Sequence, residues 1–545
     1  MSYDWKPLFP YDTTRPEQDI AIDFALDAFI NQDKKFVVIE AGTGVGKSAI
    51  GFTIAQYYNQ HTNGTGTYYL TTQKVLQQQY MRDFQKRGMF NLQSSTNFQC
   101  KYYKSKTCAM ARRELKITKD AKFKSCCGGG CRYRKAKNDF LDGEHGVTNF
   151  SYFLAETHYA GELSDRTMMV VDECHNTEIE LGNFVEIVVS EHFANQVLKL
   201  KVPNLSTQYQ VFKWIVDIYK PKLESIKKHY EAIITKLSLQ QKMKEFLKVS
   251  SQFELIDKHL CKLNRFISNY HKDNWVMNIT ETDVKNTKKY EFKPICVGPF
   301  SEPYLFKNAS KVLLMSATVM NKDAFCEVLG LPQEKVAFIS IPSPFPVENR
   351  PIITSPIASM SFKNIDKGLP KMAKAVKAIL DAHPKEKGII HCHSYKIAQY
   401  LKRNVRSKRL LTHNSQDREK KLQIHMADPR PTVLLSPSMQ EGVDLKGDLS
   451  RFQIICKVPY PYLGDKLVKK RMHKWKWWYP LQTAKMIVQS VGRSVRSDTD
   501  TAVTYILDAD WERFWNRNKE IFPKGFKDTI KSVSYTHLRA HETHE

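Results

Sequence analysis

A glycine-rich stretch near the N-terminus has the residue types and the spacing of a phosphate-binding loop. Residues 41–48 read Ala-Gly-Thr-Gly-Val-Gly-Lys-Ser, with alanine at the first position where the stricter pattern has glycine. The backbone N–H groups of such a loop, together with the N-terminus of the following helix, surround an anion. We therefore expect Gly44 and Gly46 to lie against the phosphates of a nucleotide. Lys47 is expected to reach the β- and γ-phosphates, and Ser48 to give an oxygen ligand to Mg²⁺.

Two adjacent carboxylates follow a second apolar run further along the chain. Residues 168–171 read Met-Met-Val-Val and lead directly into Asp172 and Glu173. We expect Asp172 to hold Mg²⁺ through water and Glu173 to polarise the attacking water as a general base. The alternative interpretation is an acidic surface pair without a catalytic role after a core strand. The presence of the phosphate-binding loop favours the catalytic interpretation.

Both groups of residues depend on strands to position them. Each follows a short apolar run, which is typical of a buried parallel strand. A helical pattern of apolar residues follows the loop, at Ile50, Ile54, Tyr57 and Tyr58. Strand, loop and helix in this order predict an α/β fold with the chemistry at the ends of the strands.

Four further segments place polar motifs after apolar runs. In chain order they are 312–318 (Val-Leu-Leu-Met-Ser-Ala-Thr), 388–395 (Gly-Ile-Ile-His-Cys-His-Ser-Tyr), 438–444 (Ser-Met-Gln-Glu-Gly-Val-Asp) and 489–496 (Gln-Ser-Val-Gly-Arg-Ser-Val-Arg). They resemble motifs III, IV, V and VI of superfamily-two helicases. The strings at 441–447, 457–461 and 489–496 resemble more closely the XPD/DinG family of 5′-to-3′ DNA helicases. The opening Arg15-Pro16-Glu17-Gln18 also matches, and over roughly residues 10–520 the motifs occur in the family's order.

The resemblance implies roles for several of these residues. Gln18 matches the glutamine that reads adenine, and Gly442 and Asp444 of motif V are expected at the nucleotide. Gln489, Arg493 and Arg496 of motif VI are expected to come from a second domain, the arginines bringing cations to the γ-phosphate as charge develops. Motif II departs from the family, with Cys174 where Asp-Glu-Ala-His has alanine. Cysteine is also small and apolar, so we expect little effect.

The implied fold is α/β, with two RecA-like motor domains and two insertions in the first. We expect motor domain 1 over residues 1–95, 146–180 and 296–345, an iron–sulfur domain over 96–145, and a mainly helical arch over 181–295. Motor domain 2 is expected over 346–531, after a proline-rich linker at 341–346, and 532–545 as a disordered or non-native tail. Because the sequence begins almost at the glutamine motif, we expect no N-terminal nuclease domain.

Five of the 11 cysteines lie close together, at positions 100, 108, 126, 127 and 131. Four thiolates from one segment suit either a [4Fe–4S] cluster or a tetrahedral Zn²⁺, and spacing alone does not choose. The position between motifs I and II is where the resemblance puts a four-cysteine iron–sulfur domain. We therefore expect a cluster on Cys100, Cys108, Cys126 and Cys131, with Cys127 as the alternative third ligand and zinc as the alternative metal.

The net charge is +26, and it is concentrated in the two insertions. Residues 101–140 hold 13 Lys and Arg against three Asp and Glu, and residues 191–290 hold 18 against 10. Cations with interleaved aromatic rings bind single-stranded nucleic acid through its phosphates and bases. Residues 473–479 (His-Lys-Trp-Lys-Trp-Trp-Tyr) are a second basic aromatic stretch, for which base stacking and helix packing are the two interpretations.

Composition excludes two broad classes of protein. Hydrophobic residues make up 42% and charged residues 26% of the chain, which is ordinary for a globular protein and excludes wholesale disorder. No apolar run approaches the roughly 18–20 residues of a membrane-spanning helix, and the N-terminus lacks a signal-peptide pattern. We expect a protein of the cytoplasm, or of the host cytoplasm if a phage encodes it, with no membrane partner.

The expected function is an ATP-dependent DNA helicase. It would use ATP, Mg²⁺ and a [4Fe–4S] cluster, move 5′ to 3′ on single-stranded DNA, and unwind forked duplexes as a monomer. An ATP-driven translocase that remodels RNA or protein–nucleic acid complexes is the alternative, with RNA as its partner. A nuclease with a regulatory ATPase is a third interpretation, but no nuclease carboxylate cluster is visible beyond Asp172 and Glu173.

Overall fold

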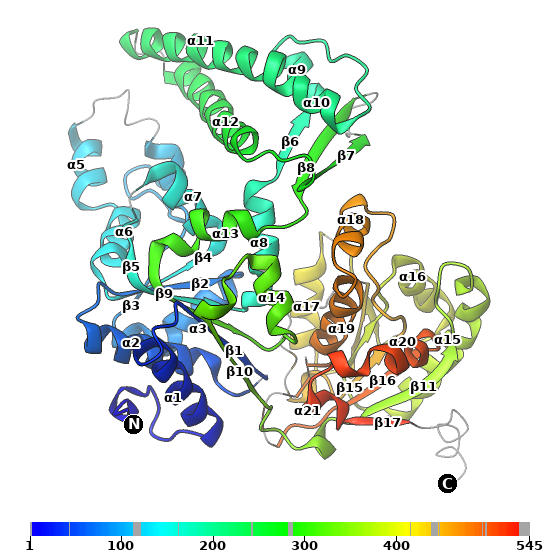
Figure 1. The fold of residues 1–545 in the computed structure, drawn as a ribbon. Helices are drawn as coiled ribbons and strands as arrows, with labels where there is room; N and C mark the ends of the chain where they lie inside the picture. The colour runs from blue at the N-terminus through cyan, green and yellow to red at the C-terminus, as the bar shows by residue number, and fades with distance from the viewer. Residues whose placement is uncertain are drawn as a thin grey trace.

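Two lobes and a projecting helical module make up the molecule (Figure 1). The computed structural model describes residues 3–42, 44–112, 121–161, 163–240, 243–281, 287–414, 416–437, 445, 447–492, 494–495, 497 and 499–532. Each lobe is built on a parallel sheet. The N-terminal two thirds of the chain form the first lobe and the projecting module, and the remainder forms the second lobe (Figure 1).

The first lobe contains a 7-stranded sheet whose described strand pairs are all parallel. Its order is β10 (Val336–Ile341), β1 (Phe36–Ala41), β9 (Ala309–Ser316), β5 (Arg166–Asp172), β2 (Thr67–Thr71), β4 (His145–Asn149) and β3 (Met89–Asn91). The helices are α1 (Pro16–Ile30), α2 (Lys47–Thr62), α3 (Lys74–Phe84), α5 (Ala121–Gly129), α6 (Arg132–Asp142), α7 (Phe150–Ala155), α8 (Thr177–Val185), α13 (Gly298–Tyr304) and α14 (Lys322–Leu329).

Strand β1 shows why apolar and polar residues alternate so little along the strands of this sheet. Val37 and Ile39 face the cluster that contains α1 and α2, whereas Phe36 and Val38 face the cluster on the opposite side of the sheet. Successive side chains of a strand point to opposite faces, and here both faces are covered. A continuous apolar run is therefore needed, and the run ends where the phosphate-binding loop begins.

The second lobe repeats this architecture with another 7-stranded sheet, again parallel in its described pairs. Its order is β13 (Leu410–Thr412), β14 (Val433–Ser436), β12 (Gly388–His391), β15 (Phe452–Ile455), β16 (Val503–Asp508), β11 (Ile352–Ala358) and β17 (Ile530–Ser532). Its helices are α15 (Ile365–Ala382), α16 (Tyr395–Asn404), α17 (Arg418–Ala427), α18 (Lys466–Lys474), α19 (Trp478–Val491), α20 (Asp510–Asn518) and α21 (Lys524–Lys527).

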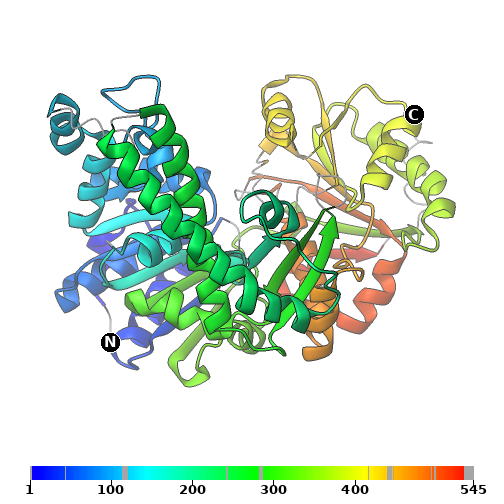
Figure 2. The ribbon, with the colours of Figure 1, turned by 90° about the horizontal axis from the view of Figure 1, so that it is seen from above.

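The projecting module combines helices with a small antiparallel sheet. The sheet order is β6 (Ile187–Ser190), β8 (Lys288–Pro294) and β7 (Trp275–Glu281), and the helices are α9 (Glu191–Gln196), α10 (Gln208–Trp214), α11 (Lys220–Leu239) and α12 (Met243–Ser268). Seen from above, α11 and α12 cross over the first lobe toward the side that carries α5 and α6 (Figure 2). No helix in the described part of the chain is both long and apolar enough to cross a membrane.

Helices α18 and α19 join the second lobe to the first. Trp475 and Trp478 are buried in the large cluster of the first lobe, and the Trp475 indole N–H donates to Glu327 of α14 (2.6 Å). The Arg471 guanidinium of α18 pairs with Glu178 of α8 (2.7 Å). Of the two interpretations of residues 473–479, helix packing is therefore the one that holds for these two tryptophans.

Candidate functional site

The phosphate-binding loop connects β1 to α2, as the strand–loop–helix pattern predicts. Gly44 and Gly46 have φ angles of 85° and 86°, and Gly46 is the N-cap of α2. The left-handed conformation of Gly46 favours glycine, and a Cβ atom there would lie 2.5 Å from the amide nitrogen of Gln18 and would displace that side chain. Thr43 lies outside the described residues. The helix N-terminus at Gly46 offers backbone N–H groups to an anion.

Gln18 braces this loop from α1. The side chain is buried; its amide donates to the Val45 carbonyl (2.8 Å) and its oxygen accepts from the Arg15 N–H (2.9 Å). The Arg15 guanidinium donates to the Gly44 carbonyl (2.7 Å). The glutamine motif therefore holds the backbone of the loop in place. Adenine reading by Gln18 stays a prediction.

Lys47 and Ser48 are the first two residues of α2, and Asp172 is the last residue of β5. Strand β9 lies between β5 and β1 in the sheet. The Lys47 ammonium donates to the Ala41 carbonyl (3.3 Å), within the loop. Burial and the neighbouring Glu173 carboxylate raise the pKa of Asp172, whereas Lys47 opposes this rise. A hydroxyl and a carboxylate are the hard oxygen donors that Mg²⁺ prefers, so Ser48 and Asp172 fit this ion.

Glu173 is turned away from the core while Asp172 stays inside it. Its backbone is left-handed (φ 52°), and its carboxylate lies 3.3 Å from Nδ1 of His175. Asp172 instead has 5% exposure and accepts from the Glu173 N–H (3.0 Å). Two adjacent carboxylates thus have different environments, which is how one protein separates an ion-binding group from a general base.

A chain of polar contacts runs from these carboxylates to the second lobe. The His175 Nδ1 atom lies 2.7 Å from the Ser316 hydroxyl, and the same hydroxyl accepts from the Thr318 N–H (3.1 Å). The Gln489 amide, on α19, then donates to the Thr318 hydroxyl (3.2 Å). Motifs II, III and VI therefore touch one another across the boundary between the lobes.

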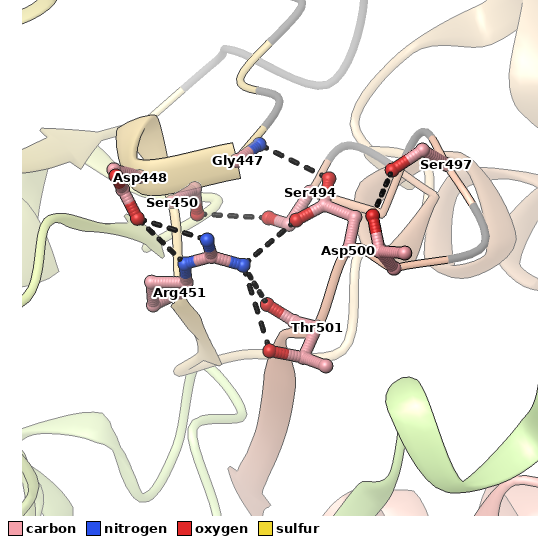
Figure 3. Close-up of polar contacts among 9 residues, drawn as sticks. Gly447, Asp448, Ser450, Arg451, Ser494, Ser497, Asp500 and Thr501 are labelled. Carbon is pink, nitrogen blue, oxygen red and sulfur yellow. Dashed lines mark hydrogen bonds and ion pairs between the residues drawn. The ribbon is translucent and has the colours of Figure 1, made fainter.

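Four other residues predicted for this site, namely Gly442, Asp444, Arg493 and Arg496, lie outside the described residues. The residues that flank both segments are described, and they are tied together (Figure 3). Arg451 bonds Asp448 (2.8 Å) and Asp500 (2.8 Å), Asp500 accepts from the Gly447 N–H (3.0 Å), and the Ser494 hydroxyl donates to that of Ser450 (2.8 Å).

The structure brings two residues to the candidate site that the sequence did not indicate. Phe345 of the linker packs on Gly44, where a Cβ would lie 1.9 Å from its ring, and it also packs with Val495 and Ala502 of the second lobe. Tyr80 of α3 donates to the Asp172 carboxylate (3.2 Å). A proline-rich linker indicates a domain boundary but not which residues it contacts. A tyrosine inside a helix has no characteristic spacing from a catalytic residue. The sequence therefore predicted neither contact.

The five clustered cysteines line one cavity, together with Lys101, Ala111, Arg112 and Phe123. The sulfur atoms of Cys108 and Cys131 lie 3.6 Å apart. Cys127 is buried, and burial raises the pKa of its thiol. The Cys131 and Cys100 thiols raise this pKa further. Arg112 and Arg134 act in the opposite direction and favour the thiolate. A donor set made only of thiols, beside guanidinium groups, fits a metal cluster.

Cys126 differs from its neighbour Cys127. Both lie on α5, and adjacent helical residues point about 100° apart. Cys127 packs with Ala111 and Phe123 and is 5% exposed, whereas Cys126 is partly exposed. Among the described residues, no three His, Cys, Asp or Glu side chains converge on a point that would hold a single metal ion.

Two family models match parts of the chain. Residues 376–529 match the family described as "Helicase C-terminal domain", and residues 12–201 match the family described as "Type III restriction enzyme, res subunit". The ATP-dependent DNA helicase DinG of Photobacterium profundum is 24% identical over 248 residues, which are 40% of this chain and 34% of that protein. The regulator of telomere elongation helicase 1 homolog of Caenorhabditis briggsae is 26% identical over 124 residues, 19% of this chain and 12% of that protein. The chain thus spans well under two thirds of either relative.

Solved structures resemble the whole fold. The structure titled "XPD_Helicase" has a TM-score of 0.63 at 16% identity and covers 96% of this chain and 100% of its own. The structure of S. tokodaii Xpd4 has a TM-score of 0.58 at 14% identity, covering 95% and 100%. At these identities the likeness shows the fold.

Proposed function

Because this chain is XPD/DinG-like, with the two-lobed fold of superfamily-two helicases, we propose that it is an ATP-dependent DNA helicase. The observation that carries the proposal is the chain of contacts from Asp172 and Glu173, through His175, Ser316 and Thr318, to Gln489. It connects a nucleotide site in one lobe to the other lobe. A change at the γ-phosphate can therefore move one lobe relative to the other.

The chemistry of the proposed site follows from its residues. The N–H groups at Gly44 and Gly46 and the Lys47 ammonium bind phosphate oxygens. Ser48 and Asp172 hold Mg²⁺, which neutralises charge on the phosphates when bound. Glu173, outside the core and next to His175, accepts a proton from the attacking water. Gln489 of the second lobe is hydrogen-bonded to Thr318 of the first lobe, so a movement of Thr318 changes this contact. Arg493 and Arg496 are proposed to reach the γ-phosphate from the second lobe.

We further propose that single-stranded DNA is the track, followed 5′ to 3′, and that forked DNA is the substrate of a monomeric enzyme in the cytoplasm. Two observations support nucleic acid as the partner. The insertions that flank the first lobe are the basic parts of the chain. The helices α11 and α12 extend over the lobe that bears α5 and α6 (Figure 2). A strand held there would meet cationic residues from both sides.

For the cysteine cavity we propose a [4Fe–4S] cluster on Cys100, Cys108, Cys127 and Cys131. The burial of Cys127 against Ala111 and Phe123 supports it over the partly exposed Cys126. The cluster, when bound, holds four separate segments of this small domain together through its thiolates. Iron content and visible absorbance of anaerobically purified protein test the proposal. Cys127→Ser should lose iron and Cys126→Ser should keep it. The reverse result, or zinc in place of iron, would overturn it.

ATP hydrolysis in the presence of different nucleic acids tests the proposed function. We expect wild-type protein to hydrolyse ATP with Mg²⁺, and single-stranded DNA to stimulate the rate more than RNA does. Lys47→Ala should abolish hydrolysis, because it removes the cation that reaches the phosphates. Activity that persists in Lys47→Ala would contradict the site, and stimulation by RNA alone would favour the remodelling of RNA over DNA unwinding.

A further inference from the structure

The Tyr80 hydroxyl contacts Asp172, one of the two residues proposed to hold Mg²⁺. It donates to one oxygen of the Asp172 carboxylate (3.2 Å), and the other oxygen accepts from the Glu173 N–H (3.0 Å). Tyr80 is 1% exposed, so water does not replace these contacts. Resting on the proposed function, we propose that Tyr80 is a positioning residue for the Mg²⁺ site, acting through Asp172.

A rigid aromatic cluster fixes the Tyr80 ring. Its centroid lies 5.6 Å from that of Tyr69 and 5.7 Å from that of Phe84, and Phe84 stacks on Phe52 of α2 at 4.6 Å. Phe52 lies on the same helix as Ser48, one turn further along. The cluster therefore ties α3, which carries the hydroxyl, to α2, which carries one proposed ligand. Large rings packed in this way leave the hydroxyl little freedom to move.

The hydrogen-bond pattern explains what the hydroxyl contributes. Asp172 receives the Glu173 N–H on one oxygen and Tyr80 on the other. A carboxylate held at both oxygens keeps a single orientation while each oxygen retains a lone pair for an ion or its water. Outer partners of this kind orient metal ligands, and their loss typically weakens metal binding by about tenfold or more. A phenylalanine at position 80 would keep the packing and lose only this restraint.

Tyr69 provides a matched control. It is equally buried, belongs to the same aromatic cluster, and its hydroxyl contacts Nδ1 of His145 (3.1 Å) instead of a proposed Mg²⁺ ligand. Tyr69→Phe therefore removes a buried hydroxyl from the same cluster without touching Asp172 or Ser48. Any effect shared by Tyr80→Phe and Tyr69→Phe would come from packing or stability.

The test measures ADP binding by the full-length protein as the Mg²⁺ concentration is varied, with EDTA as the metal-free reference. We expect Tyr80→Phe to bind ADP like wild type in EDTA but to need on the order of tenfold more Mg²⁺ for half of the metal-dependent gain in affinity. Tyr69→Phe should match wild type throughout. In an Asp172→Asn background, Tyr80→Phe should have no further effect on the Mg²⁺ midpoint, because the two residues act as one unit.

Two results would overturn the inference. One is a Mg²⁺ midpoint in Tyr80→Phe equal to that of wild type, and the other is an equal shift in Tyr69→Phe. Failure of the proposed function looks different, since wild-type protein would then show no Mg²⁺-dependent gain in ADP affinity at all. The binding readout needs no hydrolysis, so the two failures are separated in one titration series.

Discussion

Arg451→Met is expected to loosen the contacts between the described residues that follow motif V and those that follow motif VI. Arg451 is the centre of the network that joins Asp448 on one side to Asp500 and Thr501 on the other (Figure 3). Methionine keeps most of the aliphatic length and removes every donor. Asp500, whose side chain is 4% exposed, would then keep its bond from the Gly447 N–H but lose the Arg451 cation.

The size of the effect follows from burial. Hydrogen bonds to charged groups contribute about 1.5–3 kcal/mol, and breaking a fully buried ion pair costs about 3–5 kcal/mol. The Arg451 side chain is 26% exposed, so solvent screens part of the interaction. We therefore expect a loss of about 2–3 kcal/mol in local stability. At 1.4 kcal/mol per factor of ten, this is roughly a 30- to 140-fold rise in local opening.

Hydrogen exchange followed by mass spectrometry measures this opening in the intact chain. Peptides that cover β15 and β16, which begin just after Arg451 and Thr501, should exchange faster in Arg451→Met, whereas peptides from β1 and α2 should not change. Asp448→Asn is the matched control, because Asp448 contacts the same arginine but its side chain is 96% exposed. Equal exchange in Arg451→Met and Asp448→Asn would refute the argument from burial.

Three further predictions concern contacts elsewhere in the chain. Gln489→Leu removes the hydrogen bond to Thr318, which contributes about 1 kcal/mol, and should lower DNA-stimulated ATP hydrolysis about fivefold while the KM for ATP stays unchanged. The control is Gln482→Leu, two turns earlier on α19. An equal loss of hydrolysis in both variants would contradict this prediction. Phe345→Ala should lower the free energy of unfolding by about 3 kcal/mol in urea, since the ring fills the space between Gly44 and Val495, and an unchanged midpoint would argue against that packing. Burial, helped by Arg166, lowers the pKa of His145 from 6.5 to about 4, so the unfolded chain binds the proton first and stability should fall by up to about 3 kcal/mol between pH 6.5 and 4; His145→Gln should flatten this part of the urea-measured pH profile, and a profile as steep as that of wild type would contradict the assignment.

The motor elements were readable from the sequence because their signals are local. Strand, glycine loop and helix lie within about 27 residues, and a run that is buried on both faces looks the same in any parallel sheet. The same holds for Asp172 at the end of β5 and for Ser316 at the end of β9. The α/β fold was predicted on this basis, and the two motor domains were predicted from the family resemblance. The parallel α/β fold with two lobes is confirmed.

Contacts between distant residues were not readable. Tyr80 and Asp172 are 92 positions apart, and Gln489 and Thr318 are 171 apart, so no spacing rule connects them. The choice between Cys126 and Cys127 depends on which of the two is packed inside the small domain, and two adjacent identical residues give no signal for this. The pattern of residues 473–479 suited both a base-stacking surface and a core, and only the packing of α18 and α19 against the first lobe separates them.

Strand separation on tailed duplexes tests the central claim most directly. Anaerobically purified protein, with ATP and Mg²⁺, should unwind a labelled duplex that carries a 5′ single-stranded tail, and it should leave a duplex with a 3′ tail intact. Lys47→Ala should unwind neither. Unwinding from the 3′ tail alone would contradict the direction of movement. ATP hydrolysis stimulated by DNA without any strand separation would contradict the assignment as a helicase.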